Sequence, residues 1–202
     1  MVITISRQFA SGGHEIGQKL AESLGYKFYD KELIYKAAET SGINPDILKE
    51  VDEKAANSLL YSLSLGASSI IHGVSGVAQL PINDRVFIVQ QQLIKEYANE
   101  DCIIVGRCAD YVLKENKNCI KVFIYANFDF RRERAVSVER IDENSAGAVI
   151  AKKDKTRANY YNYYADTKWG DFNNYDFCIN SAFLGIDGTA KLIEEIINLK
   201  KK

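Results

Sequence analysis

The stretch from Val2 to Leu24 constrains the fold more than any other part of this 202-residue chain. Apolar, β-prone residues open it, small residues follow at 10–13, and apolar side chains then recur at helical spacing. The small residues read Ala-Ser-Gly-Gly, and glycine permits tight backbone turns that a Cβ atom would block. The stretch therefore predicts a strand, a glycine turn and a helix in direct succession.

A glycine turn in this position points backbone N–H groups and the positive end of a helix at one place, which suits a phosphate group. The alternative is a plain turn without a ligand. The Walker pattern of nucleotide-binding loops has Lys and then Ser or Thr after its last glycine, and neither is present here. We predict that the following residues bind the phosphates of a nucleotide: Ser11, Gly12, Gly13, His14 and Glu15.

Charge and cysteine content narrow the class of protein. The formal net charge is −1, so the chain lacks the overall positive field that a nucleic-acid-binding protein usually carries, and we expect no nucleic-acid partner. The four cysteines form no C-x-x-C pair, which favours buried reduced thiols over disulfides or a zinc site. They are Cys102, Cys108, Cys119 and Cys178.

Membrane and export signals are not evident in the sequence. No apolar run approaches the roughly 18 residues of a membrane-spanning helix, and Met1 leads directly into a strand. We therefore expect a cytoplasmic chain with no membrane partner. The sequence leaves the oligomeric state open.

Strands and helices alternate along most of the chain, which predicts a parallel sheet flanked by helices in a three-layer α/β fold. Segment 41–84 interrupts the alternation, and we expect a helical insertion there, within a single domain that covers 1–202. Besides the opening strand and helix, we expect strands at 26–29, 102–105, 120–126 and 175–180 and helices from 83 or 84 to 98, at 128–140 and at 186–199.

Several charged residues lie where ligands of such sheets gather, outside the carboxyl ends of the strands. Arg107 follows the apolar run 102–105 and is placed to grip a phosphate with two hydrogen bonds, with Asp110 just beyond. Lys31 and Lys36 follow the predicted strand 26–29, although solvated helix lysines are the alternative. Arg85 begins a helix, where a nearby anion would offset the unfavourable helix dipole.

A second group of charges falls in a predicted lid at about 128–160. Arg131 and Arg134 share one side of a helix and are placed to close over phosphates; the alternative is a solvated face. Asp154 and Arg157 are also helix neighbours, with mutual pairing as the alternative. Tyrosines at 160–164 fit base stacking, but the near-neutral chain favours packing against the domain.

Taken together, these motifs resemble the cytidylate kinase-like family, a branch of the P-loop nucleoside monophosphate kinases. The resemblance runs over nearly the whole chain. It implies a three-layer P-loop kinase-like fold, with ATP and Mg²⁺ as cofactors and a nucleoside monophosphate or a related small phosphate acceptor as substrate. The matching segments are 3–30, 103–113, 121–136, 154–171 and 184–189.

The resemblance also implies roles for individual residues. Arg107 matches an arginine that holds the CMP phosphate, but Cys108 stands where the family has an acid. Arg85 aligns with an arginine that grips the acceptor phosphate. Asp154 and Arg157 match an Asp-x-x-Arg pair that serves the sugar and the phosphates respectively.

Further positions match the family less closely. Arg131 and Arg134 resemble the lid arginines. Lys36 falls where an arginine contacts CMP, and Lys31 replaces a small hydroxyl residue. These two lysines, with Arg85, Arg107, Asp110 and Asp154, form the expected substrate-binding set.

The glycine turn departs most from the family, because Gly13, His14 and Glu15 occupy the Lys-Ser-Thr positions. Losing the lysine and the Mg²⁺-binding hydroxyl costs roughly several kcal/mol of transition-state stabilisation unless other groups replace them. Our hypothesis is that Glu15 or Asp30 helps to place Mg²⁺. The catalytic charge of the lysine would then come from Arg7, Arg131, Arg134 and Arg157.

Two function classes follow from these observations. One is an ATP-dependent kinase acting on CMP or another small phosphate acceptor. The other is a catalytically silent nucleotide-binding or regulatory protein that keeps the pocket and has lost the chemistry. The number of cations predicted at the pocket favours a working anion site.

Overall fold

The structure, a computed structural model, describes residues 1–30 and 82–201. Contacts divide the chain into two compact units, one made of Met1–Asp30 with Tyr97–Lys202 and the other of Lys31–Glu96. The expected insertion at 41–84 falls in the second unit, whose described part is residues 82–96 of helix α4 (Ile82–Tyr97). The rest of that insertion lies outside the described residues.

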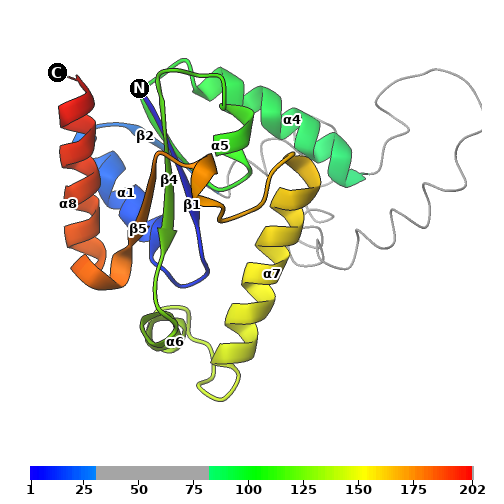
Figure 1. Ribbon diagram of the computed structural model, residues 1–202, viewed down its shortest axis with the longest axis vertical. Coiled ribbons are helices and arrows are strands. Elements are labelled where there is room, and N and C mark those ends of the chain that lie inside the picture. Colours follow the sequence, from blue (N-terminus) through cyan, green and yellow to red (C-terminus); the bar gives the residue numbers. More distant parts are fainter. Residues whose placement is uncertain (31–81, 202) are drawn as a thin grey trace, which may run out of the picture. The chain divides into compact units, whose positions relative to one another are not determined.

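The first unit is built on a five-stranded parallel sheet with the order β2-β3-β1-β4-β5 (Figure 1). All strand pairs are parallel, so the carboxyl ends of the strands meet along one edge of the sheet. β1 is central, pairing with β3 on one side and β4 on the other. The strands are β1 (Val2–Arg7), β2 (Lys27–Tyr29), β3 (Cys102–Val105), β4 (Cys119–Tyr125) and β5 (Phe177–Asn180).

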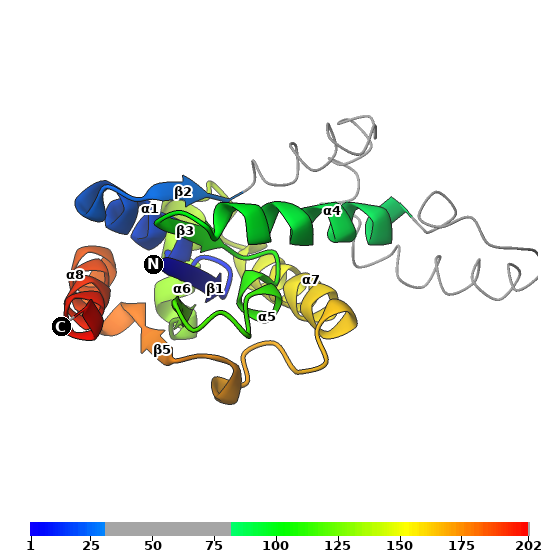
Figure 2. The same ribbon diagram turned by 90° about the horizontal axis from the view of Figure 1, so that it is seen from above.

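Helices cover both faces of this sheet, which confirms the predicted three-layer α/β fold. Helices α1 and α8 lie together on one face, and α5 and α7 lie on the other (Figures 1 and 2). Helix α6 follows β4 beyond the carboxyl edge of the sheet. The bounds are α1 (Gly13–Leu24), α5 (Ala109–Val112), α6 (Phe128–Ser137), α7 (Ala146–Tyr164) and α8 (Ser181–Lys201), with a 3₁₀ turn at Phe172–Asn174.

The main core lies between the sheet and the α1/α8 layer. Ile3 and Ile5 of β1 are fully buried there, together with Ile16 of α1 and Ile193 of α8. The strands β1, β3 and β4 are buried along nearly their whole length because both of their faces are covered, and β3 is apolar throughout. This core holds the carboxyl edge of the sheet in place, and with it the glycine turn.

The predicted boundaries of two helices need correction. Helix α4 begins at Ile82, before the predicted caps at 83 and 84. Helix α6 ends at Ser137 because Arg140, in the predicted continuation, has a left-handed backbone with φ 60°. The prediction of β3 at 102–105 is confirmed.

The closing segment also differs from its prediction. β5 begins at Phe177 rather than 175, because the preceding residues form a loop in which the Asp176 N–H donates to the Lys121 carbonyl. Helix α8 begins at Ser181, before the predicted position 186. It has a kink at Gly185, whose φ of 68° breaks the helical backbone.

The cysteine prediction holds in part. Cys102, Cys108 and Cys119 are buried free thiols, whereas Cys178 is free but exposed. The prediction of burial is wrong for Cys178 because β5 is an edge strand. None of the described helices combines the length and the apolar character that crossing a lipid bilayer requires.

Candidate functional site

The predicted glycine turn connects β1 to α1 at the carboxyl edge of the sheet. Gly12 caps the amino end of α1 with a left-handed φ of 81°, and no side chain caps the helix there. The positive φ favours glycine here, and a Cβ atom on Gly12 would lie 2.1 Å from the terminal Cδ1 of Ile186, which would have to move aside. Gly12 has no side chain that could cap the first N–H groups of α1, which suits a phosphate bound there.

Hydrogen bonds anchor this turn to the surrounding layers. Ser11 Oγ donates to the Ile124 carbonyl at 3.1 Å, and the Ser11 carbonyl accepts from Ser181 Oγ at 2.7 Å. The turn is therefore tied to β4 and to the start of α8. Ser11 is fully buried, so the structure shows its hydroxyl anchoring the turn, and its contact with a nucleotide stays a prediction.

Arg7 extends from the end of β1 across the neighbouring glycines. A Cβ atom on Gly13 would lie 2.6 Å from Arg7 Cβ, and one on Gly106 would lie 2.0 Å from Arg7 Nη1. Arg7 Nη2 lies 3.3 Å from Asp30 Oδ1. The guanidinium is therefore positioned beside the glycine turn, where the ends of β1, β2 and β3 meet.

Asp30, directly after β2, also contacts the second residue of α1. His14 Nδ1 lies 2.6 Å from Asp30 Oδ2, so the two oxygens of this buried carboxylate are divided between His14 and Arg7. His14, Arg7 and Asp30 were each predicted separately, and the structure shows that they form one cluster. The sequence indicated this cluster only in part. Arg7 ends β1 and Asp30 follows β2, and the carboxyl ends of parallel strands lie at the same end of a sheet.

Arg157 approaches the same cluster from α7. Its Nη1 donates to the Arg7 carbonyl at 3.1 Å, and its guanidinium lies over the Phe9 ring. Burial, reinforced by the charge of Arg7 and to a smaller extent by that of Arg107, lowers the pKa of Arg157 to about 9. An anion bound between these guanidinium groups would favour the charged form again.

The two lid arginines of α6 are each paired with a carboxylate. Arg131 Nη1 lies 2.5 Å from Asp154 Oδ2, and Arg134 Nη2 lies 2.8 Å from Glu15 Oε2. Asp154 also accepts a hydrogen bond from the Phe9 N–H at 2.7 Å. Asp154 therefore pairs with Arg131 of α6. The alternative that Asp154 and Arg157 pair with each other along α7 is not supported.

These two arginines also keep unused hydrogen-bond donors. The Nε atoms of Arg131 and Arg134 are both buried, and neither has a hydrogen-bond partner within residues 1–30 and 82–201. A buried guanidinium N–H without a partner is costly and indicates a place for an acceptor. Arg134 contacts Glu15 in the first turn of α1, and Arg131 is linked through Asp154 to Phe9, just before the glycine turn.

Arg107 lies in a strained turn at the end of β3. Gly106, Arg107 and Cys108 all have positive φ, at 75°, 61° and 54°. Left-handed conformations of consecutive non-glycine residues cost energy and persist only where the surroundings impose them, often at functional sites. The strained turn therefore supports the prediction that Arg107 serves a ligand.

Asp110 lies beneath this turn rather than at its surface. Only 2% of it is exposed, and its carboxylate accepts hydrogen bonds from Ser6 Oγ at 3.0 Å and Tyr161 O–H at 2.7 Å. Burial raises the pKa of Asp110 in spite of these hydrogen bonds. The structure thus holds Asp110 between Ser6 of β1 and Tyr161 of α7, and direct substrate binding stays a prediction.

Three predicted substrate-binding residues are not placed by the structure. Lys31 and Lys36 lie outside the described residues. Arg85 lies in the first turn of α4, as expected, but its side chain is outside the description. Their roles stay predictions.

The proposed Mg²⁺ residues fit a metal only in part. Glu15 pairs with Arg134, and Asp30 contacts His14 and Arg7. Within the described ranges, no group of three His, Cys, Asp or Glu side chains is arranged to hold a metal ion. Mg²⁺ in kinases is bound mostly through substrate phosphates with one or two carboxylates, so either residue would have to exchange its present partner.

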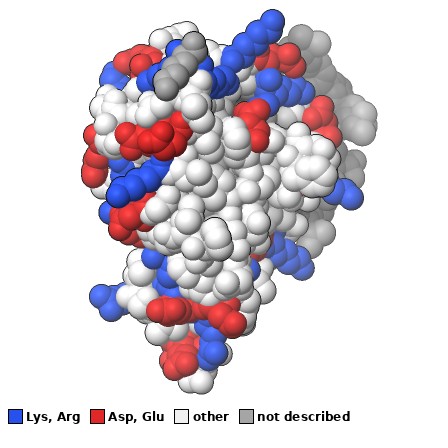
Figure 3. Space-filling model, turned by 60° about the vertical axis from the view of Figure 1, so that its left-hand side comes forward, with Lys and Arg blue, Asp and Glu red and all other residues white. Residues whose placement is uncertain are grey.

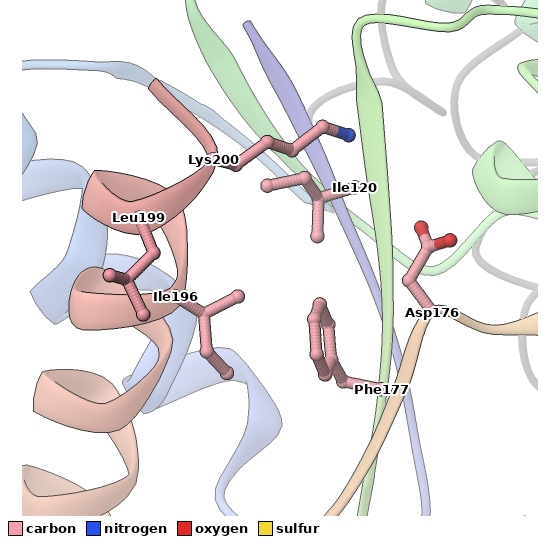
Figure 4. Close-up of a pocket in the computed structure, with 6 residues that line it drawn as sticks. All are labelled: Ile120, Asp176, Phe177, Ile196, Leu199 and Lys200. Atoms are coloured by element: carbon pink, nitrogen blue, oxygen red, sulfur yellow. The ribbon is translucent and has the colours of Figure 1, made fainter. Parts of the chain in front are cut away.

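A cavity of about 460 Å³ lies elsewhere, between α8 and the strands β4 and β5 (Figure 4). Ile120, near the amino end of β4, forms part of its wall with Phe177 and Leu199. The cavity therefore lies near the amino ends of β4 and β5, whereas the glycine turn lies at the carboxyl ends of the strands. Its mainly apolar wall does not suit phosphates. The face that carries α8 shows charges of both signs around an uncharged centre (Figure 3).

Comparison with known proteins gives the family. The cytidylate kinase-like family matches residues 2–182. The chain belongs to this family. The match confirms the resemblance noted from the sequence motifs, and a family of nucleotide kinases accounts for a glycine turn surrounded by arginines.

Individual family relatives are distant in sequence. The cytidylate kinase of Chloroflexus aggregans is 27% identical over 187 residues, with 75% of this chain and 78% of that enzyme covered. The cytidylate kinase of Natronomonas pharaonis is 25% identical over 199 residues, with 98% of this chain and 90% of that enzyme covered.

Solved structures support the same fold. A protein from Eubacterium ventriosum has a TM-score of 0.72 and 29% identity, with 98% of both chains covered. The shikimate kinase of Bacteroides thetaiotaomicron has a TM-score of 0.56 and 13% identity, also with 98% of both chains covered. At that identity the second likeness shows the P-loop kinase fold alone.

Proposed function

We propose that this member of the cytidylate kinase-like family transfers the γ-phosphoryl group of ATP to a nucleoside monophosphate or a related small phosphate acceptor. The family match, the relatives named cytidylate kinase and the P-loop kinase fold support nucleotide kinase activity in general. The position of Arg107 supports a phosphate-bearing acceptor. Arg107, at the end of β3, lies on the side of the turn where ligands of parallel sheets bind.

The observation that carries the proposal is the position of Arg7. Its side chain passes over Gly13, which stands where the Walker lysine is expected, and over Gly106. A guanidinium in this place supplies the positive charge that the loop itself lacks, in a planar form that binds phosphate with two hydrogen bonds. Substituting Cβ-bearing residues for either glycine would displace it.

The surrounding arginines complete the charge that phosphoryl transfer requires. Catalysis of this reaction is mostly positioning and neutralisation of charge on the transferred group. Burial and neighbouring cations lower the pKa of Arg157 to about 9, so a bound anion would stabilise its charged form, and the buried Nε donors of Arg131 and Arg134 lack an acceptor within the described residues. Together with the amino end of α1, these groups surround the turn.

Mg²⁺ has a limited part in this proposal. When bound with ATP, it would neutralise charge on the phosphates and orient them. Glu15 and Asp30 are the carboxylates next to the turn that could reach it after exchanging partners. Arg7 and Arg157 bind and orient the phosphates in either case.

The test combines turnover with binding. The full chain is incubated with ATP, MgCl₂ and a panel of nucleoside monophosphates, and ADP release is measured alongside calorimetric titration of ATP. We expect acceptor-dependent ADP release with CMP or another member of the panel. Binding of ATP without transfer to any acceptor would instead support the catalytically silent alternative. If ATP did not bind, both the kinase function and the silent nucleotide-binding function would be contradicted.

A further inference from the structure

A buried carboxylate joins three elements of the candidate site. Asp110, in the first turn of α5, accepts hydrogen bonds from Ser6 Oγ of β1 at 3.0 Å and from the Tyr161 hydroxyl of α7 at 2.7 Å. All three residues are buried, with exposed fractions of 2% for Asp110, 4% for Ser6 and 3% for Tyr161. We call these three residues the Asp110 network. The central strand and the two helices on one face of the sheet (Figure 1) therefore meet at a single side chain.

The two hydroxyls of the Asp110 network each lie close along the chain to an arginine of the site. Ser6 directly precedes Arg7 in β1. Tyr161 follows Arg157 by four residues on α7, so the two side chains lie on the same side of that helix. These two arginines are themselves joined, because Arg157 Nη1 donates to the Arg7 carbonyl at 3.1 Å. Fixing both hydroxyls against one carboxylate therefore helps to fix the backbones that carry both arginines.

The carboxylate is close in sequence to a third arginine of the site. Arg107 stands three residues before Asp110, in the turn that has three consecutive positive φ angles. A backbone hydrogen bond joins this turn to α5, since the Ala109 N–H donates to the Gly106 carbonyl at 3.1 Å. Such a strained turn persists only where its surroundings hold it. The side chain of Asp110 is placed to do so, because it ties the start of α5 to β1 and α7.

A contribution to stability alone does not account for this carboxylate. A carboxylate loses its hydration on burial, and only a cation in good geometry compensates well for that loss. The side-chain hydrogen-bond partners of Asp110 within the described residues are both neutral hydroxyls. An apolar side chain of similar volume would fill this place at lower cost. A carboxylate, in contrast, holds its two partners at fixed distances.

From this arrangement we infer that Asp110 is a positioning residue, which holds the three neighbouring arginines at fixed spacing around the transferred phosphoryl group. The arginines are Arg7, Arg107 and Arg157. The inference rests on the proposed function. Phosphoryl transfer depends on accurate placement of charge, and a displacement of about 1 Å costs on the order of 100-fold in rate. Asp110 acts through its two hydroxyl partners and through the strained turn, without touching the substrate.

Removing one hydroxyl at a time tests the inference with little change in side-chain volume. Tyr161→Phe and Ser6→Ala each delete one hydrogen bond to the carboxylate, and kinetics are measured for the full chain with ATP, MgCl₂ and the best acceptor. We expect kcat to fall on the order of tenfold in each variant, with the KM for ATP within about twofold of the natural value. Loosely held guanidinium groups still contact phosphate in the ground state but no longer match the transition state, which produces this split.

Ile197→Val is the control for a loss of stability without a change in the site. Ile197 is fully buried in α8, on the opposite face of the sheet from α5 and α7 (Figure 2). Shortening it should lower the urea midpoint about as much as the loss of one hydrogen bond does, while kcat stays within about twofold. Lowered urea midpoints with an unchanged kcat in both hydroxyl variants would show a purely structural role and overturn the inference.

A double variant tests whether the carboxylate is the shared element. In Asp110→Ala, the additional change Tyr161→Phe should lower kcat no further, because the hydroxyl acts only through the carboxylate. A further tenfold loss would contradict the inference. If Asp110→Ala does not fold, the two hydroxyl variants and the following measurement decide.

Arginine NMR gives a readout that needs no turnover. The ¹⁵N–¹H signal of the Arg157 Nε–H group is assigned with Arg157→Met and recorded for the chain without nucleotide. A guanidinium that is held in place gives a distinct signal, whereas a mobile one averages toward the position of an unfolded chain. We expect the signal to move toward that position in Tyr161→Phe and to stay in place in Ile197→Val. An unchanged signal in Tyr161→Phe would overturn the inference.

The two readouts separate this inference from the proposed function. Absence of transfer from ATP to any acceptor would overturn the proposed function, and the NMR measurement would still decide whether the Asp110 network holds Arg157 in place. Transfer with the same kcat in the natural chain and both hydroxyl variants would overturn the positioning role of Asp110 and leave the kinase activity in place.

Discussion

The two sides of the glycine turn hold their arginines differently. On the α6 side, Arg131 and Arg134 each have a carboxylate of their own, Asp154 and Glu15, at 2.5 and 2.8 Å. The other side, which we call the β3 side, holds Arg7, Arg107 and Arg157. There Arg157 of α7 donates to the Arg7 carbonyl instead, and burial with neighbouring cations lowers its pKa to about 9. Arg7 shares the carboxylate of Asp30, at 3.3 Å, with His14.

This difference indicates how each side responds to phosphate. A guanidinium that is paired with a carboxylate must exchange that partner or share it, so binding gains little net charge neutralisation. A guanidinium that is buried near other cations gains from an anion, because the anion removes the electrostatic penalty. We therefore expect large functional effects on the β3 side and smaller ones on the α6 side.

The largest effect should come from Arg7→Met. This change removes the proposed substitute for the Walker lysine, and kcat/KM for transfer from ATP should fall on the order of 100- to 1000-fold. Steady-state kinetics with the best acceptor of the panel measure it. Arg132→Met is the matched control, since Arg132 is exposed and pairs with Glu143. A loss of less than threefold in Arg7→Met would contradict the assigned role of the β3 side.

Asp154→Asn should have the next largest effect. The change leaves Arg131 without its charged partner and weakens the acceptor for the Phe9 N–H, so the free energy of unfolding should fall by about 1–3 kcal/mol. Transfer activity should fall about tenfold, as the lid arginine is no longer held. Urea denaturation and kinetics measure the two effects. Glu143→Gln, in an exposed pair, should change stability by less than about 0.5 kcal/mol.

The pH dependence of nucleotide binding sharpens the comparison further. The folded pKa of Arg157, about 9, lies below its ordinary value of 12.5, so its positive charge, and with it the proposed contact to phosphate, is lost as pH rises through 9. ADP affinity in EDTA should fall about fourfold between pH 8 and 9.5, from the change in protonated fraction. Calorimetry measures this fall, and Arg157→Met should lack it. Equal pH dependence in both proteins would show that other groups are responsible.

The same pKa also predicts the sign of a stability effect. Because the folded state disfavours the charge, Arg157 destabilises the protein at pH values below about 9. This destabilisation should be relieved as pH rises from about 9 toward 12.5, the opposite of a salt-bridged lysine. The difference in unfolding free energy between the natural chain and Arg157→Met, followed against pH, measures it.

The smallest effect should come from Glu15→Gln, on the α6 side. The change releases Arg134 from a half-exposed carboxylate and removes a negative charge from the phosphate site, so ADP affinity in EDTA should rise about two- to threefold. Glu22→Gln, on the same helix, is the control. A weaker affinity in EDTA would mean that the pair with Arg134 preorganises the site. A loss seen only with Mg²⁺ would support the predicted metal role of Glu15.

Much of the fold was predictable because it depends on local patterns. The apolar run 102–105 became β3 as predicted, and Gly25 ends α1 with a left-handed φ of 67°. Features set by non-local packing were missed. Cys178 is exposed because β5 lies at the sheet edge, and strand order cannot be read from the strand itself.

The candidate site also has a part that local sequence patterns predict and a part that depends on non-local packing. The sequence alone determined which residue types gather at the glycine turn, since strands, a turn and helix faces follow from neighbours a few positions apart. Only the tertiary structure decided the partners, as in His14 with Asp30, Glu15 with Arg134 and Arg7 with Arg157. The last two pairs lie 119 and 150 residues apart, and such distant groups meet only when the parallel sheet aligns the ends of its strands.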